Sequence, residues 1–519
     1  ANAYVAETVA NSGIRLRHPQ RVRQAAESGP LGVFHLFLKP SFFAAVFKWT
    51  NKEIEGRGGD PVTMDQFRAY VGLEIATSIV HFNNLKDYWS KGMFRGHPDF
   101  KNVMSRTTFQ NIRGSLKFYP CVPSEALNNP LWHSKFILEH IRMNIAALAV
   151  CVGAAGFDEN SLRCKAACAA VTYIPSKPDE WAIRFYVLCA WLLPLILMFW
   201  DNNAGNTTGA NPAKMFAQKF GLGSVYRKHF EGEGKKKTQR WIKIPKNTPS
   251  ALWVLMMIYQ CSVDKEDLGH PANKRMIVMD NYYTRPVIGD VLSDASQGNI
   301  KILGTCKLTN QTLVNQLLIQ KATQILSSRD PVTKLPLYKK GDWLLLQALV
   351  DVPDQGRGKN KIVGGRRPYE NAGFIVIKDR GTVVLYTNDL AFTPPEEINY
   401  PSDHIIQCVR GLAPLKRWLG SESVQRSTIM VPCFLVLYIF LMLAVDRMDH
   451  YRALLLCQRM EKRVPMTVWT WTLDVSLVGD MSVRLALDPN SKVTYKDVKI
   501  DVATALVQPL IAQTKSHQG

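Results

Sequence analysis

The stretch KRMIVMDNYYTRP, residues 274–286, contains a short apolar run that ends on an acidic residue. Residues 276–279 predict a buried strand, and Asp280 follows it directly. In open α/β sheets, ligands and catalytic groups gather at the carboxyl ends of the strands, so Asp280 is a candidate site residue. Asp also ends strands simply because it favours turns. The residue alone does not distinguish the two roles.

Length and charge set wider limits. The chain has 519 residues, more than one hydrophobic core usually organises, so we expect two to four domains or a core with insertions. Its 64 Lys and Arg residues against 43 Asp and Glu give a net charge of +21. This excess favours a polyanionic partner, of which nucleic acid is the commonest; the alternative is a basic surface without a partner.

The cysteines predict neither a zinc site nor disulfides. Of the ten, only Cys164 and Cys168 are close in sequence, and no second Cys or His pair stands at zinc-knuckle spacing from them. We therefore expect no structural zinc in this chain, and scattered thiols indicate a reducing compartment. The polar N-terminus predicts no secretory signal, and because it lacks an initiating Met we expect a fragment or an edited chain.

Two apolar runs, residues 185–200 and 429–445, could be mistaken for membrane spans. Both are shorter than the roughly 20 residues that a span needs, and they contain Pro194 and Pro432. We interpret both as core elements and expect no membrane association.

The region before residue 150 is expected to be mainly helical. Residues 32–56 carry aromatic side chains at helical spacing and predict a helix broken or kinked at Pro40. Residues 62–80 predict a second helix capped by Thr63, and a further helix follows Ser105.

After residue 149 the pattern changes to apolar runs typical of strands in the middle of a sheet. One run leads to Asp158, residues 181–200 predict two adjacent strands, and a helix and another strand are expected after Asp280. Residues 227–246 carry eight basic residues and two Glu, which predicts either a solvated loop or a finger that binds the DNA backbone. Trp241 among the lysines favours the finger.

The last third of the chain predicts strands and then helices. Residues 306–425 alternate in hydrophobicity and predict a β-rich insertion with a basic loop at 356–367. Residues 434–456 predict a helix that carries Asp446 and Asp449 on one face. From residue 466 onward we expect a helix or a strand pair and then a polar end.

Three carboxylates thus stand out: Asp158, Asp280 and Asp446. Mg²⁺ and Mn²⁺ take oxygen ligands, and phosphoryl transfer by two such ions needs a carboxylate cluster of this kind. The separations of 280 − 158 = 122 and 446 − 280 = 166 residues mean that only a fold could bring the three together. Spacing alone does not select this triple, because any long protein offers many.

A resemblance selects it. The blocks DQFRAYVGLEIATSIV, FDENSL, KPDEWAIRF, VMDNYYT and VDRMDHY, in this order, resemble those of the piggyBac transposase family over about residues 32–487. That resemblance implies a DDE-type transposase with a ribonuclease H-like core, two Mg²⁺ or Mn²⁺ ions held by Asp158, Asp280 and Asp446, and a supporting Asp449. It also implies double-stranded DNA cut and joined at TTAA sites, a homodimer and a nuclear location.

The resemblance and the basic segments together give the expected DNA-binding residues. Lys177 falls with Trp181 in the block after the first catalytic strand, where DNA positioning is expected. The others are the basic residues of the two segments above: Arg227, Lys235, Lys236, Lys237, Arg240, Lys243, Arg357, Lys359, Lys361, Arg366 and Arg367.

The chain also departs from the family pattern. Leu443 and Ala444 stand where glycines usually precede the third Asp, CAWLLPLILMFW lacks the usual turn glycine, and no Cys follows Cys457, as a zinc module would require. These changes suggest a decayed or domesticated copy. The alternative hypothesis is therefore a non-catalytic DNA-binding or chromatin protein.

The expected architecture is an α/β protein with a ribonuclease H-like catalytic core, a helical N-terminal domain and a β-rich insertion. Its divisions are a polar N-terminal tail (1–30), a helical dimerisation or DNA-binding region (31–150), the first part of the core (151–305), the insertion (306–425), the last core helix (426–487) and a C-terminal tail (488–519).

Overall fold

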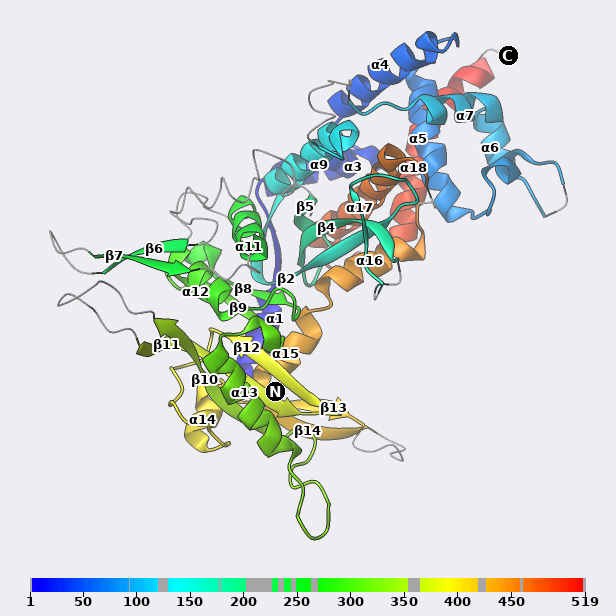
Figure 1. The fold of residues 1–519 in the computed structure, drawn as a ribbon. Helices are drawn as coiled ribbons and strands as arrows, with labels where there is room; N and C mark the ends of the chain where they lie inside the picture. Colours follow the sequence, from blue (N-terminus) through cyan, green and yellow to red (C-terminus); the bar gives the residue numbers. More distant parts are fainter. Residues whose placement is uncertain are drawn as a thin grey trace.

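The computed structural model describes residues 2–516 apart from several internal gaps. The gaps are 93, 120–128, 176, 178, 202–225, 232–237, 244–248, 263–268, 353–364, 419–425 and 458–460. The fold is mixed α/β, as predicted, and a large sheet runs between a helical end and a second, strand-rich end (Figure 1).

The central sheet has ten strands in the order β10-β11-β12-β9-β8-β2-β4-β3, with β1 beside β2 and β5 beside β4. The strands of this sheet are β1 Gly13–Leu16, β2 Ala149–Arg163, β3 Val171–Tyr173, β4 Trp181–Ala190, β5 Ile196–Asp201, β8 Arg275–Met279, β9 Ile300–Thr305, β10 Trp343–Val352, β11 Gly365–Lys378 and β12 Thr382–Thr387. β2, β8 and β9 run parallel, whereas β4 is antiparallel to β2. The predicted strands at 181–200 are confirmed as β4 and β5, and the one at 276–279 as β8, which begins one residue earlier.

The helical end confirms the pattern before residue 150. Its helices are α3 Pro30–Phe37, α4 Pro40–Gly56, α5 Met64–Ile79, α6 Pro98–Val103, α7 Arg106–Ser115 and α9 Lys135–Leu148. Pro40 begins α4 after a break, Thr63 forms a capping box with Gln66, and the Ser105 side chain accepts a hydrogen bond from Thr108 N. Each cap satisfies N–H groups that the first helical turn leaves without a partner.

Both chain ends are more ordered than expected. Residues 1–30, predicted as a polar tail, contain α1 Ala3–Ala10, β1 and α2 Pro19–Glu27, and β1 pairs with β2. Residues 488–519, also predicted as a tail, contain α18 Tyr495–Ser516, which packs on α5 at the helical end (Figure 1). Gly72 of α5 allows this approach, because a Cβ there would lie 2.8 Å from the Ala503 carbonyl oxygen. Both segments are polar in overall composition, which led to the prediction of tails. Their apolar residues nevertheless lie on faces that pack against the core.

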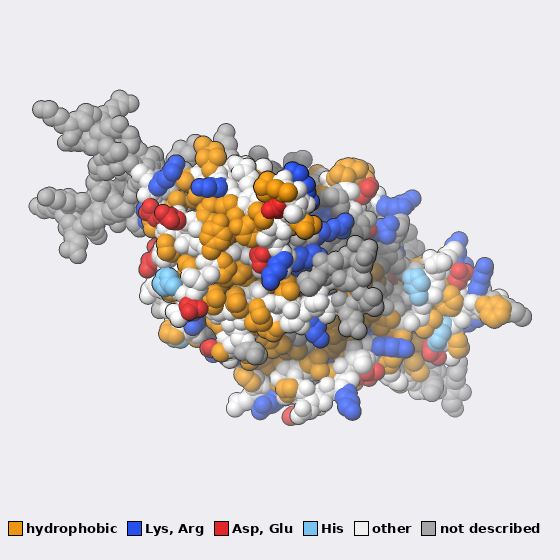
Figure 2. Space-filling model, turned by 90° about the horizontal axis from the view of Figure 1, so that it is seen from below, with side chains coloured by type: hydrophobic (Ala, Val, Ile, Leu, Met, Phe, Trp, Pro, Cys, Tyr) orange, Lys and Arg blue, Asp and Glu red, His pale blue; other side chains and the backbone are white. Residues whose placement is uncertain are grey.

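The strand-rich end extends the central sheet. The predicted β content of 306–425 is present, and β12 pairs with β9, so β10–β12 continue the sheet. This end also contains α13 Leu313–Ser327, α14 Asp403–Cys408, and the pair β13 Leu412–Arg417 and β14 Ser427–Pro432. Seen from this end, hydrophobic, basic and acidic side chains share the surface (Figure 2). The division of the chain into domains stays a prediction.

The late helices cross from the sheet to the helical end (Figure 1). They are α15 Cys433–Leu441, α16 Ala444–Leu454 and α17 Val464–Leu487, and α11 Pro249–Gln260 and α12 Pro286–Ala295 lie in the preceding part of the chain. The predicted helix 434–456 is thus two helices with a break between them. The segment after 466 is one helix rather than a strand pair.

Neither apolar run forms a membrane span. The first supplies β4 and β5, and the second supplies β14, α15 and the start of α16. Among the described residues no single helix is long and apolar enough to cross a membrane. The bent pair α3 and α4 meets these requirements only when the two helices are taken together, and Val33, Phe34 and Phe37 of α3 are buried in the core.

Candidate active site

Two of the expected carboxylates lie side by side on neighbouring parallel strands. Phe157 of β2 pairs in register with Met279, the last residue of β8. Asp158 follows Phe157 and Asp280 follows Met279, so the two Asp residues occupy equivalent positions where the pairing of β2 with β8 ends. Asp158 differs from its prediction in one respect: it lies inside β2, which continues to Arg163, and not after the strand.

Asp280 itself is held by the turn that follows β8. Its Oδ1 accepts hydrogen bonds from the backbone N–H groups of Tyr282, at 2.9 Å, and Tyr283, at 3.3 Å. The Thr284 hydroxyl donates to the Asp280 carbonyl oxygen at 2.7 Å. The DNYYT sequence therefore fixes the carboxylate at the end of the strand.

The third carboxylate comes from α16, which packs on β2 and β4. Asp446 lies in the first turn of this helix and is exposed. Gly156 of β2 permits the approach, because a Cβ there would lie 2.7 Å from the Ala444 Cβ and 3.2 Å from the Leu441 carbonyl oxygen. Gly156 thus lets α16 pack closely on β2.

Electrostatics show that the acidic side chains act on one another. Burial first, and then the negative charge of Asp280, raise the pKa of Asp158 to about 7 from its ordinary value of 3.8, and Asp446 contributes in the same direction. Burial also raises the pKa of Asp280, against the lowering effect of its two backbone N–H partners. Such raised values mark functional sites more often than structural ones.

Lys177 lies close to these carboxylates. Burial raises the pKa of Asp158, Asp280 and Asp449, and in each case the Lys177 ammonium lowers it. Lys177 belongs to the turn between β3 and β4, where its N–H donates to the Ile174 carbonyl oxygen at 3.2 Å. The structure thus brings it together with the acidic residues.

Asp449 has a different environment. Its Oδ1 accepts hydrogen bonds from Asn160 Nδ2 and, at 2.9 Å, from Arg452 Nη1. Asn160 Oδ1 in turn accepts from Arg452 at 3.0 Å and from the Trp471 indole at 3.0 Å. These bonds join β2, α16 and α17. Asn160 was not among the predicted residues, and the only signal for it was a polar residue two positions after Asp158 on the same strand face.

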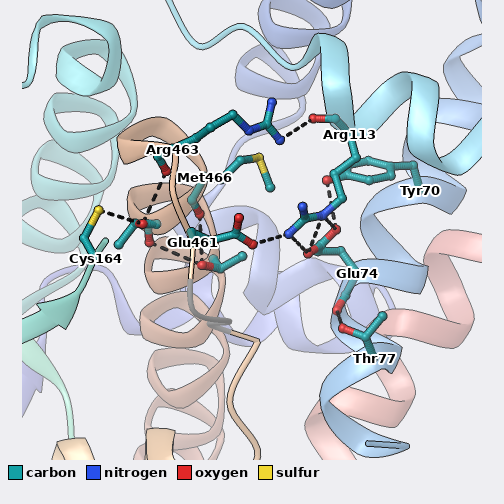
Figure 3. Close-up of polar contacts among 10 residues, drawn as sticks. Tyr70, Glu74, Thr77, Arg113, Cys164, Glu461, Arg463 and Met466 are labelled. Carbon is teal, nitrogen blue, oxygen red and sulfur yellow. Dashed lines mark hydrogen bonds and ion pairs between the residues drawn. The ribbon is translucent and has the colours of Figure 1, made fainter. Parts of the chain in front are cut away.

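A second buried network fixes the segment that follows α16 (Figure 3). Arg113 of α7 forms ion pairs with Glu74 of α5 and with Glu461. Tyr70 donates to Glu74 at 3.0 Å, and Arg463 donates to the Arg113 carbonyl oxygen at 2.9 Å. The helix α16, which carries Asp446, is therefore bonded to β2 through Asp449 and Arg452. The segment that follows this helix is bonded to α7 through Glu461 and Arg463.

The donor set suits a hard divalent cation, since carboxylate oxygens are what Mg²⁺ and Mn²⁺ prefer. Asp158 and Asp280, with Asp446, are the residues that would hold it. Burial first, and then the negative charge of Asp280, raise the pKa of Asp158, and a cation would offset the second of these effects. Within the described part of the chain, however, no three His, Cys, Asp or Glu side chains lie close enough together to hold one ion.

Five of the other predicted DNA-binding residues lie in described strands. Arg227, Arg240 and Lys243 belong to the two-stranded sheet of β6 Tyr226–Glu231 and β7 Thr238–Lys243. Arg366 and Arg367 are exposed near the start of β11. The remaining six are outside the described residues: Lys235, Lys236, Lys237, Arg357, Lys359 and Lys361.

Comparisons with known proteins agree with this picture. The family described as Transposase IS4 matches residues 29–199. The cryo-EM structure of a piggyBac transposase synaptic complex with hairpin DNA has a similar fold, with a TM-score of 0.62 over 97% of this chain and 84% of that one. The sequence identity is 14%, so this likeness is one of fold. No curated protein matched the sequence.

Together these findings agree with the resemblance identified in the sequence: residues 29–199 match a transposase family, and the fold of the chain is similar to that of a piggyBac transposase.

Proposed function

We propose that this chain is a piggyBac-like transposase, or derives from one, and that it cuts and joins DNA strands by metal-dependent phosphoryl transfer. Asp158, Asp280 and Asp446 are the proposed catalytic residues of a ribonuclease H-like core. The observation that carries the proposal is the equivalent register of Asp158 and Asp280 on parallel neighbouring strands, with the helix of Asp446 packed on the same strand.

Bound divalent ions, two Mg²⁺ or Mn²⁺, would activate the attacking water or 3′-hydroxyl and stabilise the leaving oxygen. The chain's own residues supply the rest. Asp158 and Asp280 present carboxylate oxygens from rigid strands, the Tyr282 and Tyr283 amides orient Asp280, and Asn160 and Asp449 position the helix of Asp446. Lys177 would bind the phosphate next to the carboxylates, because it is the cation whose charge already acts on them.

The proposed substrate is double-stranded DNA with TTAA-type target sites, bound by a homodimer in the nucleus. The net charge of +21 supports a polyanionic substrate. Exposed Arg366 and Arg367 and the basic β6–β7 hairpin are the proposed contacts to the DNA backbone.

Nicking of supercoiled DNA by the purified chain tests the proposal. We expect nicking with Mn²⁺ or Mg²⁺ and its loss in Asp280→Asn. Asp488→Asn, a change of an exposed Asp at the end of α17, is the matched control and should leave nicking unchanged. Absence of nicking above the Asp280→Asn level under both metals would contradict the catalytic proposal.

A second function is supported by two observations. The described residues contain no closed group of three metal-ligating side chains, and Leu443 and Ala444 replace the glycines expected before the third Asp. A domesticated DNA-binding or chromatin protein without catalysis would bind DNA with strong salt dependence, and this binding would survive loss of all three Asp residues.

A further inference from the structure

Two aromatic side chains stand uncovered at the edge of the sheet near the candidate site. Tyr173 of β3 and Trp181 of β4 are register partners on antiparallel strands. Their rings lie 4.8 Å apart at 37°, and the residues are 50% and 57% exposed. β3 ends the central sheet. The pair, which we call the aromatic platform, therefore offers its free ring surface to solvent.

Single exposed apolar residues are ordinary in proteins, so exposure alone does not indicate a binding site. Phe94, for example, is 93% exposed. The platform differs because its two large rings adjoin each other and one of them, Trp181, lines a hollow of about 510 Å³ together with Arg163 and Lys165. Aromatic rings beside basic groups are the surface on which nucleic-acid bases stack.

The hollow is lined by two basic residues, Arg163 and Lys165, and two acidic ones, Asp179 and Glu180, so the positive charge that favours DNA comes from Lys177 nearby. Arg163 pairs with Asp179 at 3.2 Å, while Lys165 is exposed. Lys177 lies in the turn that joins the two platform strands, and its positive charge acts on Asp158 and Asp280. One hairpin thus carries both the rings and the cation that faces the carboxylates. A DNA strand that reaches the carboxylates therefore meets Lys177 close to them and the platform further along.

The sheet register sets the distance. Asp158 pairs with Val187 and Arg163 pairs with Ala182, the neighbour of Trp181. Five residues of β2 separate the two pairs, which corresponds to about 17 Å along the strand.

We propose that the aromatic platform stacks on an unpaired base of the DNA strand whose phosphate faces Asp158 and Asp280. This inference rests on the proposed function, since it takes DNA as the substrate. It specifies a distorted or partly single-stranded DNA and not a regular duplex, because bases inside a duplex do not expose their faces to a protein ring.

Binding of two duplexes that differ only in one unpaired 2-aminopurine tests the proposal. All measurements use Asp280→Asn, so that no strand is cut. We expect the bulged duplex to bind about 5- to 150-fold more tightly than the paired one, the range that corresponds to one stacked base. Trp181→Ala should abolish this preference and the accompanying change in 2-aminopurine fluorescence, and Trp181→Phe should retain most of both.

Phe94→Ala is the matched control, because it removes an exposed ring elsewhere and should leave the preference unchanged. The platform residues are exposed, so their substitution should not alter the melting temperature. Equal binding of the two duplexes, or a preference that persists in Trp181→Ala, would overturn the proposal. A change in sedimentation of Trp181→Ala without any bulge preference would assign the platform to a protein contact instead. None of these outcomes depends on nicking, so they are separate from the test of the proposed function.

Discussion

The side-chain amide of Asn160 donates a hydrogen bond to Asp449, 289 residues later in the chain. Asn160 is fully buried and also accepts hydrogen bonds from Arg452 and Trp471. One short polar side chain on β2 therefore links the strand of Asp158 to the helix of Asp446 and to α17. These bonds hold α16, the helix that carries Asp446, against the strand that carries Asp158.

Asn160→Ala should destabilise the protein by about 1–3 kcal/mol, because it removes the acceptor of the buried Trp471 indole and the hydrogen bonds that Asn160 makes with Arg452 and Asp449. Urea unfolding followed by tryptophan fluorescence measures the change. Asn490→Ala alters an exposed Asn and should have little effect. Equal midpoints for the two variants would show that the network does not stabilise the fold.

Gly156→Ala should separate α16 from β2. The new methyl group would lie 2.7 Å from the Ala444 Cβ, and overpacking of this kind costs about 1–3 kcal/mol. We expect a lower melting temperature and, if the chain nicks DNA, a larger loss of nicking than of DNA binding. Gly381→Ala meets nothing within 4 Å and serves as the control. A melting temperature equal to that of the control would contradict the close approach described here.

Arg113→Ala should be the most damaging of these substitutions. It leaves Glu74 as a buried charge without its cation, and breaking a buried pair in this way costs about 3–5 kcal/mol. The comparison is Arg57→Ala, which removes a solvent-exposed ion pair with Glu53 and should cost less than about 1 kcal/mol. Thermal unfolding measures the melting temperature of both variants. Similar decreases in the two melting temperatures would contradict a larger contribution from the buried ion pair.

Asp480 predicts a specific pH dependence. Burial raises the pKa of this carboxyl to about 6 from its ordinary value of 3.8, although Arg484 opposes the shift. The folded state therefore favours the protonated form, so this group's contribution to stability is greatest below pH 3.8 and is lost as the pH rises towards 6. The loss is on the order of 3 kcal/mol for about two pKa units.

The free energy of unfolding of wild type minus that of Asp480→Asn should accordingly fall between pH 4 and pH 7. Denaturant titrations at several pH values measure this difference, and Asp488→Asn, at an exposed position, should give a flat line. A difference that rises with pH would reverse the sign and exclude the proposed cause.

Local patterns were enough to predict much of the fold. Apolar runs gave β4, β5 and β8, and Pro40, Thr63 and Ser105 marked the starts of three helices because proline and capping residues act through their immediate neighbours. Asp280 was placed correctly at the end of its strand for the same reason. The resemblance, and not spacing, selected Asp158 and Asp446 as its partners.

What the sequence did not reveal depends on long-range packing. The polar end of β2 remains a strand because α16 and α17 pack on it. This packing involves residues far apart in the sequence, so no local pattern predicts it. The spacing of Val498, Val502 and Leu506 could have predicted α18 as an amphipathic helix, since all three lie on one buried face. Nothing in the sequence indicated the role of Asn160 except that it lies two residues after Asp158 and so shares its face of the strand.

The order of assembly follows from the position of β2 in the chain. Its partners are β1, made before it, β8, made more than a hundred residues later, and α16, whose Asp449 lies 289 residues after Asn160. At about 5–20 residues per second, a ribosome needs about 15–60 s to make that interval. A nascent chain can therefore contain its first helices and strands while it still lacks two of its three proposed catalytic carboxylates, so the site can be completed only when synthesis is almost finished.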